Sequence, residues 1–226
     1  VPSLLTWPAS AIVHDIKGPL TTIKGYAQLL GTKDLTDEQR ANFSQIITEA
    51  VDNFAGMTQE ILDYARGEQS LTVRPFDLEE FLSDLHQFIT KDFAERGIEV
   101  RLDIDCQGEI RGDRQKLWRA FYNIAKNAAE AMETTCHCDD ALCITARQAD
   151  DWAELVISDT GPGIPPEIQP KVLQPFATYG KLHGTGLGLS IARSIIEAHH
   201  GRLSLASEVG KGTSVTIRLP LEAKAQ

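Results

Sequence analysis

An uninterrupted stripe of apolar residues in the first third of the chain is the feature that most constrains its fold. The stripe advances by alternating steps of four and three residues through Phe43, Ile47, Ala50, Phe54, Met57, Ile61 and Tyr64. Such spacing keeps the apolar side chains on one side of an α-helix and is typical of coiled coils and helical bundles. A similar stripe runs from Val13 to Leu30, before a turn at 31–36. The pattern therefore predicts an antiparallel helical hairpin.

One hairpin by itself buries this stripe poorly. We therefore expect two copies of the chain to pair through their hairpins into a dimeric four-helix bundle. The alternative is a helical subdomain that packs against the remainder of the same chain.

The pattern changes after residue 68. Arg74-Pro75 indicates a linker, which we place at 69–76. Asp77 and Asp113 are the expected N-caps of two helices. Helices are expected at 77–93, 113–132 and 188–199, and strands at 99–104, 142–147, 154–158, 203–206 and 214–219. This mixture predicts an α/β sandwich over 77–226, with helices covering one face of a sheet.

Charge and composition exclude several classes of function. The 32 acidic and 22 basic residues give a formal net charge of −10, which disfavours nucleic acid as a partner. The sequence contains no apolar run of about 18 residues that would predict a membrane span. The four cysteines do not form a spaced disulfide framework. We expect a cytoplasmic fragment, and because it starts at Val1 without methionine, we expect an upstream sensor or membrane segment to precede it.

His14 lies beside the apolar stripe of the first expected helix, where a histidine is usually an ordinary surface residue. Its neighbour Asp15 is able to accept a hydrogen bond from the imidazole and leave the other ring nitrogen as a nucleophile. Gly18, Pro19 and Gly25 all weaken this helix. A softened helix beside an exposed histidine favours a chemical role for His14.

Two glycine-rich segments suggest a ligand site. Asp159-Thr160-Gly161-Pro162-Gly163 follows an expected strand; its glycines allow close approach to a flat ligand, and its carboxylate suits an amino group such as that of adenine. GTGLGLS at 184–190 opens an expected helix, whose free N–H groups suit a polyphosphate. Each segment alone is also compatible with an ordinary turn. Neither matches the Rossmann fingerprint, and the chain has no P-loop.

Asn123 and Asn127 are one helical turn apart and share a helix face. Amide oxygens are suitable ligands for Mg²⁺ beside substrate phosphates. As an isolated pair, asparagines are more often solvated surface residues.

Five segments occur together in order: HDIKGPL at 14–20, NIAKNAAEAM at 123–132, DTGPGIP at 159–165, QPFATYGK at 174–181 and GTGLGLS at 184–190. Their order and spacing resemble the catalytic core of two-component sensor histidine kinases over essentially the whole chain. NAAEAM and PFATYGK are most similar to the nitrogen-regulation branch. The resemblance implies a dimerising phosphotransfer hairpin at 1–68 and, at 77–226, an ATP-binding domain of the superfamily shared with gyrase and heat-shock chaperones.

The resemblance also implies individual roles. His14 would be the phosphoacceptor and Asp15 its general base or orienting partner. Asp159 would hold the adenine amino group, and Asn127 would bind Mg²⁺, with Asn123 one turn before it. Gly161 and Gly163 would shape the base pocket, and Thr178 and Lys181 would reach the terminal phosphate. The lid over the phosphates would be formed by Gly184, Gly186, Leu187 and Gly188.

The implied reaction moves the terminal phosphoryl group of ATP, with Mg²⁺, to His14 and then to an aspartate of a response regulator receiver domain. Two residues depart from the family pattern. Gly18 stands where many relatives carry a threonine or asparagine tied to phosphatase activity, and Glu130 stands where many carry a lysine. A serine/threonine kinase on the same ATP-binding fold and a non-catalytic dimerising scaffold are the alternatives.

A cysteine cluster lies outside the family pattern. Cys136, His137, Cys138 and Cys143 are close in sequence and include side chains that bind zinc or respond to redox change. Their spacing is not a standard zinc pattern, and Cys143 is compatible with an ordinary strand position.

Overall fold

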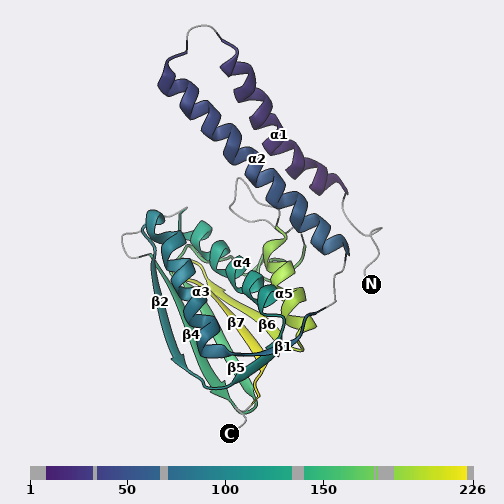
Figure 1. Ribbon diagram of the computed structural model, residues 1–226, viewed down its shortest axis with the longest axis vertical. Coiled ribbons are helices and arrows are strands. Elements are labelled where there is room, and N and C mark those ends of the chain that lie inside the picture. The colour runs from purple at the N-terminus through teal and green to yellow at the C-terminus, as the bar shows by residue number, and fades with distance from the viewer. Residues whose placement is uncertain are drawn as a thin grey trace. The chain divides into compact units, whose positions relative to one another are not determined.

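The computed structural model describes residues 9–32, 35–66, 71–133, 140–175, 177 and 186–222. The chain divides into a helical unit within Val1–Glu68 and an α/β unit built from Gln69–Gly180 and Gly188–Gln226. Figure 1 shows the elements of both units.

The helical unit is an antiparallel hairpin of α1 (Ala9–Leu30) and α2 (Asp37–Arg66), as the apolar stripes predict (Figure 1). Tyr26 of α1 packs against Phe43 of α2, with 5.3 Å between ring centroids. A reciprocal capping box starts α2: the Gln39 N–H donates to Thr36 Oγ1, and the Thr36 N–H donates to Gln39 Oε1. Helix α1 continues through Pro19.

The α/β unit contains a five-stranded sheet with the order β2-β4-β5-β7-β6. Its strands are β2 (Glu99–Asp105), β4 (Ala141–Ala149), β5 (Trp152–Asp159), β6 (Arg202–Glu208) and β7 (Gly212–Pro220). Only β2 and β4 pair in parallel, and the other neighbours are antiparallel. Every strand expected from the sequence is present, with bounds that differ by a few residues.

Part of the expected linker at 69–76 forms a strand in a second, two-stranded sheet. Strand β1 (Arg74–Asp77) pairs antiparallel with β3 (Glu109–Gly112), so Arg74-Pro75 is strand rather than linker. Pro75 is tolerated because β1 pairs on one side only and the missing N–H removes no ladder bond from a central strand. The pairing joins residues far apart in sequence, and local periodicity carries no signal for it.

Helices α3 (Leu78–Phe93), α4 (Arg114–Met132) and α5 (Gly188–Ala198) cover one face of the large sheet (Figure 1). A single 3₁₀ turn, η2 (Ala94–Arg96), follows α3. Both expected N-caps are confirmed, because Asp77 accepts from the Glu80 N–H and Asp113 from the Lys116 N–H. Alternate residues of β4, β5 and β7 point into a core shared with the helices, for example Ile144, Leu155 and Ile217.

The fold class is therefore a helical hairpin followed by an α/β sandwich, as expected. The pairing of two hairpins stays a prediction. Within the ranges that the structure covers, none of the helices is both long enough and apolar enough to cross a bilayer.

Candidate nucleotide site

Helix α4 presents the two asparagines on one face. The Asn127 side-chain N–H donates to the Asn123 backbone oxygen over 2.8 Å, which fixes the orientation of the Asn127 amide. The Asn123 amide nitrogen is buried and has no hydrogen-bond partner among the described residues. A buried amide N–H without a partner costs free energy, and an acceptor bound at this position would satisfy it.

The first residue of α5 lies directly against this face. A Cβ atom built on Gly188 would stand 3.1 Å from the Asn127 amide nitrogen and 4.0 Å from the Asn123 Cβ. Only glycine lets the start of α5 approach α4 this closely without displacing Asn127. The N–H groups of the first turn of α5 therefore open beside two side-chain amides, an arrangement suited to phosphate with a bound cation.

Asp159 ends β5 and holds the loop that follows it. Its Oδ1 accepts the Gly161 N–H over 2.9 Å and the Thr213 N–H over 3.1 Å. Both bonds use the same oxygen, so the carboxylate is fixed in orientation with its second oxygen outside these bonds. Burial raises the pKa of Asp159, and the bonds from Gly161 and Thr213 only partly offset that effect.

The loop after Asp159 is pressed against the turn between β6 and β7. Gly163 has φ +71°, and a Cβ at this position would collide with the Glu208 backbone oxygen. The Gly210 N–H donates to the Pro162 oxygen over 2.8 Å. Glycine is required at 163 because no other residue combines this backbone conformation with so close an approach.

The end of α4 connects this loop to the asparagine face. A Cβ on Gly161 would lie 3.4 Å from Met132 Cγ, and the Thr160 hydroxyl lies 3.7 Å from the Met132 sulfur. Asn127 precedes Met132 by five residues, a rise of about 8 Å along a helix. Gly188 thus packs against the asparagine face of α4, and the Asp159 loop packs against Met132 near the end of the same helix.

Other predicted residues are placed only in part. Gly186 has φ +63°, and Leu187 is completely buried just before α5. His14 and Asp15 lie in the backbone of α1, but their side chains are outside the described part. Thr178, Lys181, Gly184, Cys136 and Cys138 also lie outside the described residues.

Cys143 is half-buried on β4. Within the described ranges, no group of three or more His, Cys, Asp or Glu side chains is placed to hold a metal ion. The zinc hypothesis for the cysteine cluster stays a prediction, because its other members are not described.

The amide-lined face of α4 fits Mg²⁺ by its chemistry and packing. Asn127 supplies a hard amide oxygen for the ion, and the buried Asn123 N–H donor beside it suits an acceptor such as a phosphate oxygen. The absence of a side chain at 188 keeps the start of α5 within packing distance of Asn127. These are the residues that would hold the ion.

Three residues that hold Asp159 and the loop after it are not predicted from the sequence. They are Gln169, Ser207 and Thr213. The sequence signal for Ser207 and Thr213 is the glycine-rich turn at 210–212 between the expected strands at 203–206 and 214–219, and Gln169 has no comparable signal. A tight turn next to the nucleotide loop is a feature that only the folded chain makes visible.

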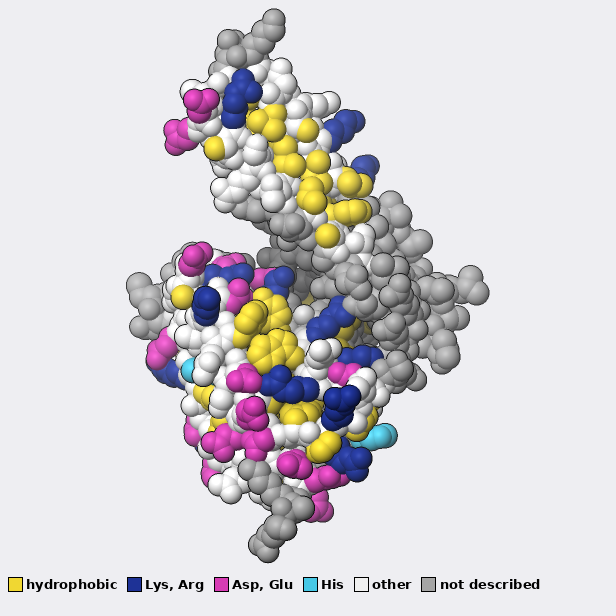
Figure 2. Space-filling view, viewed as in Figure 1, with side chains coloured by type: hydrophobic (Ala, Val, Ile, Leu, Met, Phe, Trp, Pro, Cys, Tyr) yellow, Lys and Arg dark blue, Asp and Glu magenta, His cyan; other side chains and the backbone are white. Residues whose placement is uncertain are grey.

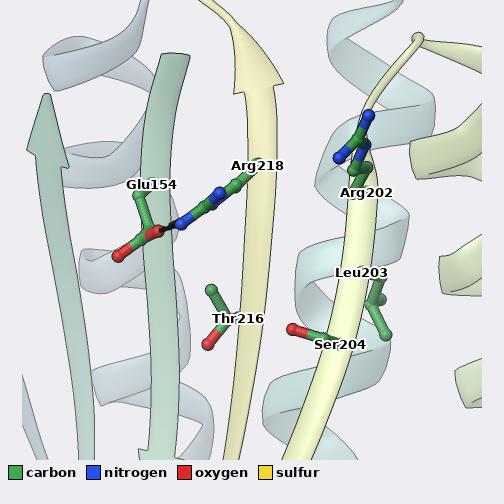
Figure 3. Close-up of a pocket in the computed structure, with 6 residues that line it drawn as sticks. All are labelled: Glu154, Arg202, Leu203, Ser204, Thr216 and Arg218. Carbon is green, nitrogen blue, oxygen red and sulfur yellow. Dashed lines mark hydrogen bonds and ion pairs between the residues drawn. The ribbon is translucent and has the colours of Figure 1, made fainter. Parts of the chain in front are cut away.

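A separate pocket lies on the outer face of the sheet, away from the candidate site (Figure 3). Arg218 donates to Glu154 over 2.7 Å, and Arg202 stands opposite Arg218 in the β6–β7 register. The pocket is lined by Glu154, Arg202, Leu203, Ser204, Thr216 and Arg218. None of these residues belongs to the predicted site.

Two family models match the chain. Residues 9–70 match the His Kinase A (phospho-acceptor) domain. Residues 112–223 match the histidine kinase-, DNA gyrase B- and HSP90-like ATPase. The two matches fall on the helical hairpin and on the α/β unit respectively.

Curated relatives agree with these matches. The chain is 30% identical over 215 residues to sporulation kinase B of Bacillus subtilis (strain 168), covering 95% of the chain and 49% of that protein. It is 27% identical over 214 residues to the sensor histidine kinase ZraS of Escherichia coli (strain K12), covering 94% of the chain and 45% of that protein. The chain thus spans about half the length of these relatives.

A solved structure shares the fold. Full-length ShkA in complex with AMPPNP superimposes with a TM-score of 0.71 at 25% identity, covering 97% of this chain and 47% of that chain. The narrower similarity to the nitrogen-regulation branch stays a prediction. With a phospho-acceptor hairpin followed by an ATPase domain, the chain belongs to the two-component sensor histidine kinases and corresponds to their catalytic core.

Proposed function

We propose that this chain is a protein-histidine kinase that transfers the terminal phosphoryl group of ATP to His14 and relays it to a response regulator. The observation that supports the proposal is the packing of Gly188 against Asn123 and Asn127 on α4, with the Asp159 loop packed against Met132 near the end of the same helix. The family matches support it, because a phospho-acceptor domain precedes the ATPase domain.

Each part of the site would bind a different part of the nucleotide. The Asp159 carboxylate would accept the adenine amino group through its second oxygen, since the backbone N–H groups of Gly161 and Thr213 both bind Oδ1. The first turn of α5 would donate its N–H groups to the phosphates. Asn127, with Asn123, would hold Mg²⁺, which supplies neutralisation of phosphate charge during transfer. Thr178, Lys181, Gly184 and Gly186 are proposed as phosphate and lid contacts.

In the transfer itself, an imidazole nitrogen of His14 forms a bond to the terminal phosphorus while the bond to the ADP oxygen breaks. The imidazole gives up a proton, for which Asp15 is the proposed acceptor or orienting partner. Catalysis rests mainly on positioning and on neutralising charge. The phosphoryl group then passes from His14 to an aspartate carboxylate of the receiver domain.

The hairpin is the proposed dimer interface. Leu20 and Leu29 of α1 and Val51 of α2 are each close to half exposed, although they lie on an amphipathic hairpin. Figure 2 shows hydrophobic side chains along the visible face of this unit. A second hairpin would cover such residues in a four-helix bundle.

The proposed docking face for the response regulator follows His14 along α1. Lys17, Thr21, Lys24 and Gln28 recur at intervals of three or four residues and are all exposed. A receiver domain bound there would stand next to the phosphoacceptor. We also propose that the full protein places this core in the cytoplasm under the control of a sensor region. The domain limits are proposed as 1–68 and 74–226 in place of 77–226, because β1 belongs to the α/β unit and shortens the linker to 69–73.

Incubation with ATP labelled at the terminal phosphate tests the proposal. We expect label on the wild-type chain that is labile to acid and absent from His14→Ala. The matched control is His200→Asn, because His200 is exposed and asparagine accepts its positive φ. Acid-stable label would favour a serine/threonine kinase, whereas nucleotide binding without label would favour a scaffold.

A further inference from the structure

Ser207 of β6 is the centre of a hydrogen-bond cluster behind the candidate nucleotide loop. Its Oγ accepts the Ile164 N–H over 2.8 Å. It also lies 2.9 Å from the Gly212 oxygen and 2.9 Å from the Thr213 hydroxyl. A hydroxyl has one donor and two acceptor positions. With Gly212 as acceptor and Ile164 and Thr213 as donors, every hydrogen-bonding position of Ser207 is used.

Gln169 completes the same cluster from the other side of the loop. Its side-chain amide donates to the Ile164 oxygen over 2.7 Å and to the Ser207 backbone oxygen over 2.7 Å. Both amide hydrogens are therefore used. The N–H and the C=O of Ile164 are each held by a side chain, one from Ser207 and one from Gln169.

This cluster controls a loop that has no helix or strand of its own. Residues 160–165 belong to neither, so side-chain bonds replace the ladder that would fix a strand. Thr213 ties the cluster to the candidate site, because its hydroxyl contacts Ser207 while its N–H donates to Asp159 Oδ1. The position of the Asp159 carboxylate and that of the loop are thus set by the same few bonds.

We propose that Ser207 and Gln169 are positioning residues of the nucleotide pocket, which hold the 161–165 loop and Asp159 in the geometry that accepts the purine base. The proposal rests on the proposed function, in which ATP binds here. These side chains act on the base end of the nucleotide through the loop. They therefore govern affinity for any ligand that carries the base and leave the phosphoryl transfer step itself unaffected.

Calorimetric titration of ATP and of ADP into the wild type and variants tests this. Ser207→Ala is expected to weaken both nucleotides by the same factor, about tenfold, because both carry the base. Ser207→Thr, which keeps the hydroxyl, is expected to recover most of the affinity. In autophosphorylation assays Ser207→Ala should raise KM for ATP while kcat at saturating ATP stays near the wild-type value. Gln169→Leu should act in the same direction and serves as the second variant if Ser207→Ala fails to fold.

Lys211→Ala is the matched control. Lys211 lies in the same β6–β7 turn, where it is exposed and forms an ion pair with Glu208. It should bind both nucleotides as the wild type does. Wild-type affinity in both Ser207→Ala and Gln169→Leu overturns the inference alone, as does a loss of kcat with unchanged KM. A wild-type chain that binds neither ATP nor ADP overturns the proposed function as well.

Discussion

Asp113 and His199 are joined by a buried hydrogen bond, in which the Asp113 backbone N–H donates to His199 Nε2 over 2.8 Å. The other ring nitrogen lies 2.7 Å from the Ile195 oxygen, so these partners select the neutral tautomer with its proton on Nδ1. The Asp113 side chain accepts the N–H groups of Thr72 and Lys116. Through these three hydrogen bonds Asp113 joins the start of α4, the end of α5 and the segment that enters the α/β unit.

Stability should fall in mild acid because of His199. Burial lowers the pKa of His199, and the bond to Ile195 and the nearby Asp113 carboxylate do not compensate. A histidine in the unfolded chain titrates near pH 6.5. Below this pH the unfolded chain binds a proton on this residue that the folded chain binds less tightly, so protonation favours unfolding. The His199 contribution is thus complete above the unfolded pKa and is lost as the pH falls from there through the lowered folded pKa.

Urea denaturation of the wild type and of His199→Gln at pH 7.5 and pH 5.5 measures this effect. The variant should be less stable at pH 7.5 and should lose less free energy of unfolding between the two pH values. An equal loss in both proteins would show that His199 does not carry the dependence.

Asp159→Asn should separate stability from binding. The folded chain holds the Asp159 proton to a higher pH than the unfolded chain does, because the pKa of Asp159 is raised. The protonated carboxyl therefore contributes stability below the ordinary aspartate pKa, and this contribution is lost as the pH rises through the raised pKa of the folded chain. At neutral pH the ionised carboxylate lowers the stability. Asparagine keeps Oδ1 for the Gly161 and Thr213 N–H groups but turns an N–H donor toward an amino ligand. We expect unfolding free energy at pH 7 equal to or above the wild type, and ATP affinity lower by about tenfold or more.

Denaturation and calorimetric titration of the same Asp159→Asn preparation give both quantities. A variant that binds ATP normally would contradict the assignment of Asp159 to the base. Wild-type ATP affinity should also decline, as the pH falls, at a higher pH than for an ordinary aspartate.

His200→Gly should stabilise the α/β unit. Helix α5 ends with the His200 N–H donating to the Glu197 oxygen and the Gly201 N–H donating to the Ile196 oxygen, which is a Schellman motif. His200 holds its left-handed position at φ +59°. Glycine removes the Cβ penalty, so we expect a gain of about 1 kcal/mol in unfolding free energy. Gly97→Ala, at φ +70° in open space, is the opposite control and should lose stability.

Gly188→Ala should weaken nucleotide binding in the presence of Mg²⁺. The new Cβ would stand 3.1 Å from the Asn127 amide nitrogen, so Asn127 must shift. We expect ATP affinity measured with Mg²⁺ to fall severalfold, and affinity measured in EDTA to change less. The control is Gly25→Ala in α1, where nothing lies within 4 Å of the added Cβ. It should stabilise the hairpin by up to about 1 kcal/mol and leave ATP affinity unchanged.

Local patterns explain why much of the fold was predictable. The apolar stripe of α2 and the caps Asp77 and Asp113 act over one or two helical turns, so the residues that form each element also reveal it. Strands β4, β5 and β7 largely alternate fully buried residues with less buried ones, which is again a local property. The glycine and asparagine segments indicated the ligand site because close approach and amide ligands restrict residue choice.

Long-range contacts explain what was missed. Strand β1 forms only because Glu109–Gly112 lies beside it, and Ser207 acts on Ile164 across 43 positions of sequence. His199 and Asp113 are 86 positions apart. Such bonds leave no periodicity in either segment.

The sequence by itself determined the hairpin and the α/β sandwich and indicated the residues proposed for the nucleotide site, since periodicity, capping and glycine placement are local consequences of side-chain chemistry. Only the tertiary structure decided how that site is held. The α4 face meets Gly188, and the Asp159 loop is fixed by Ser207, Gln169 and Thr213. Those positions depend on hydrogen bonds and close packing between distant segments, which exist only once the chain has folded.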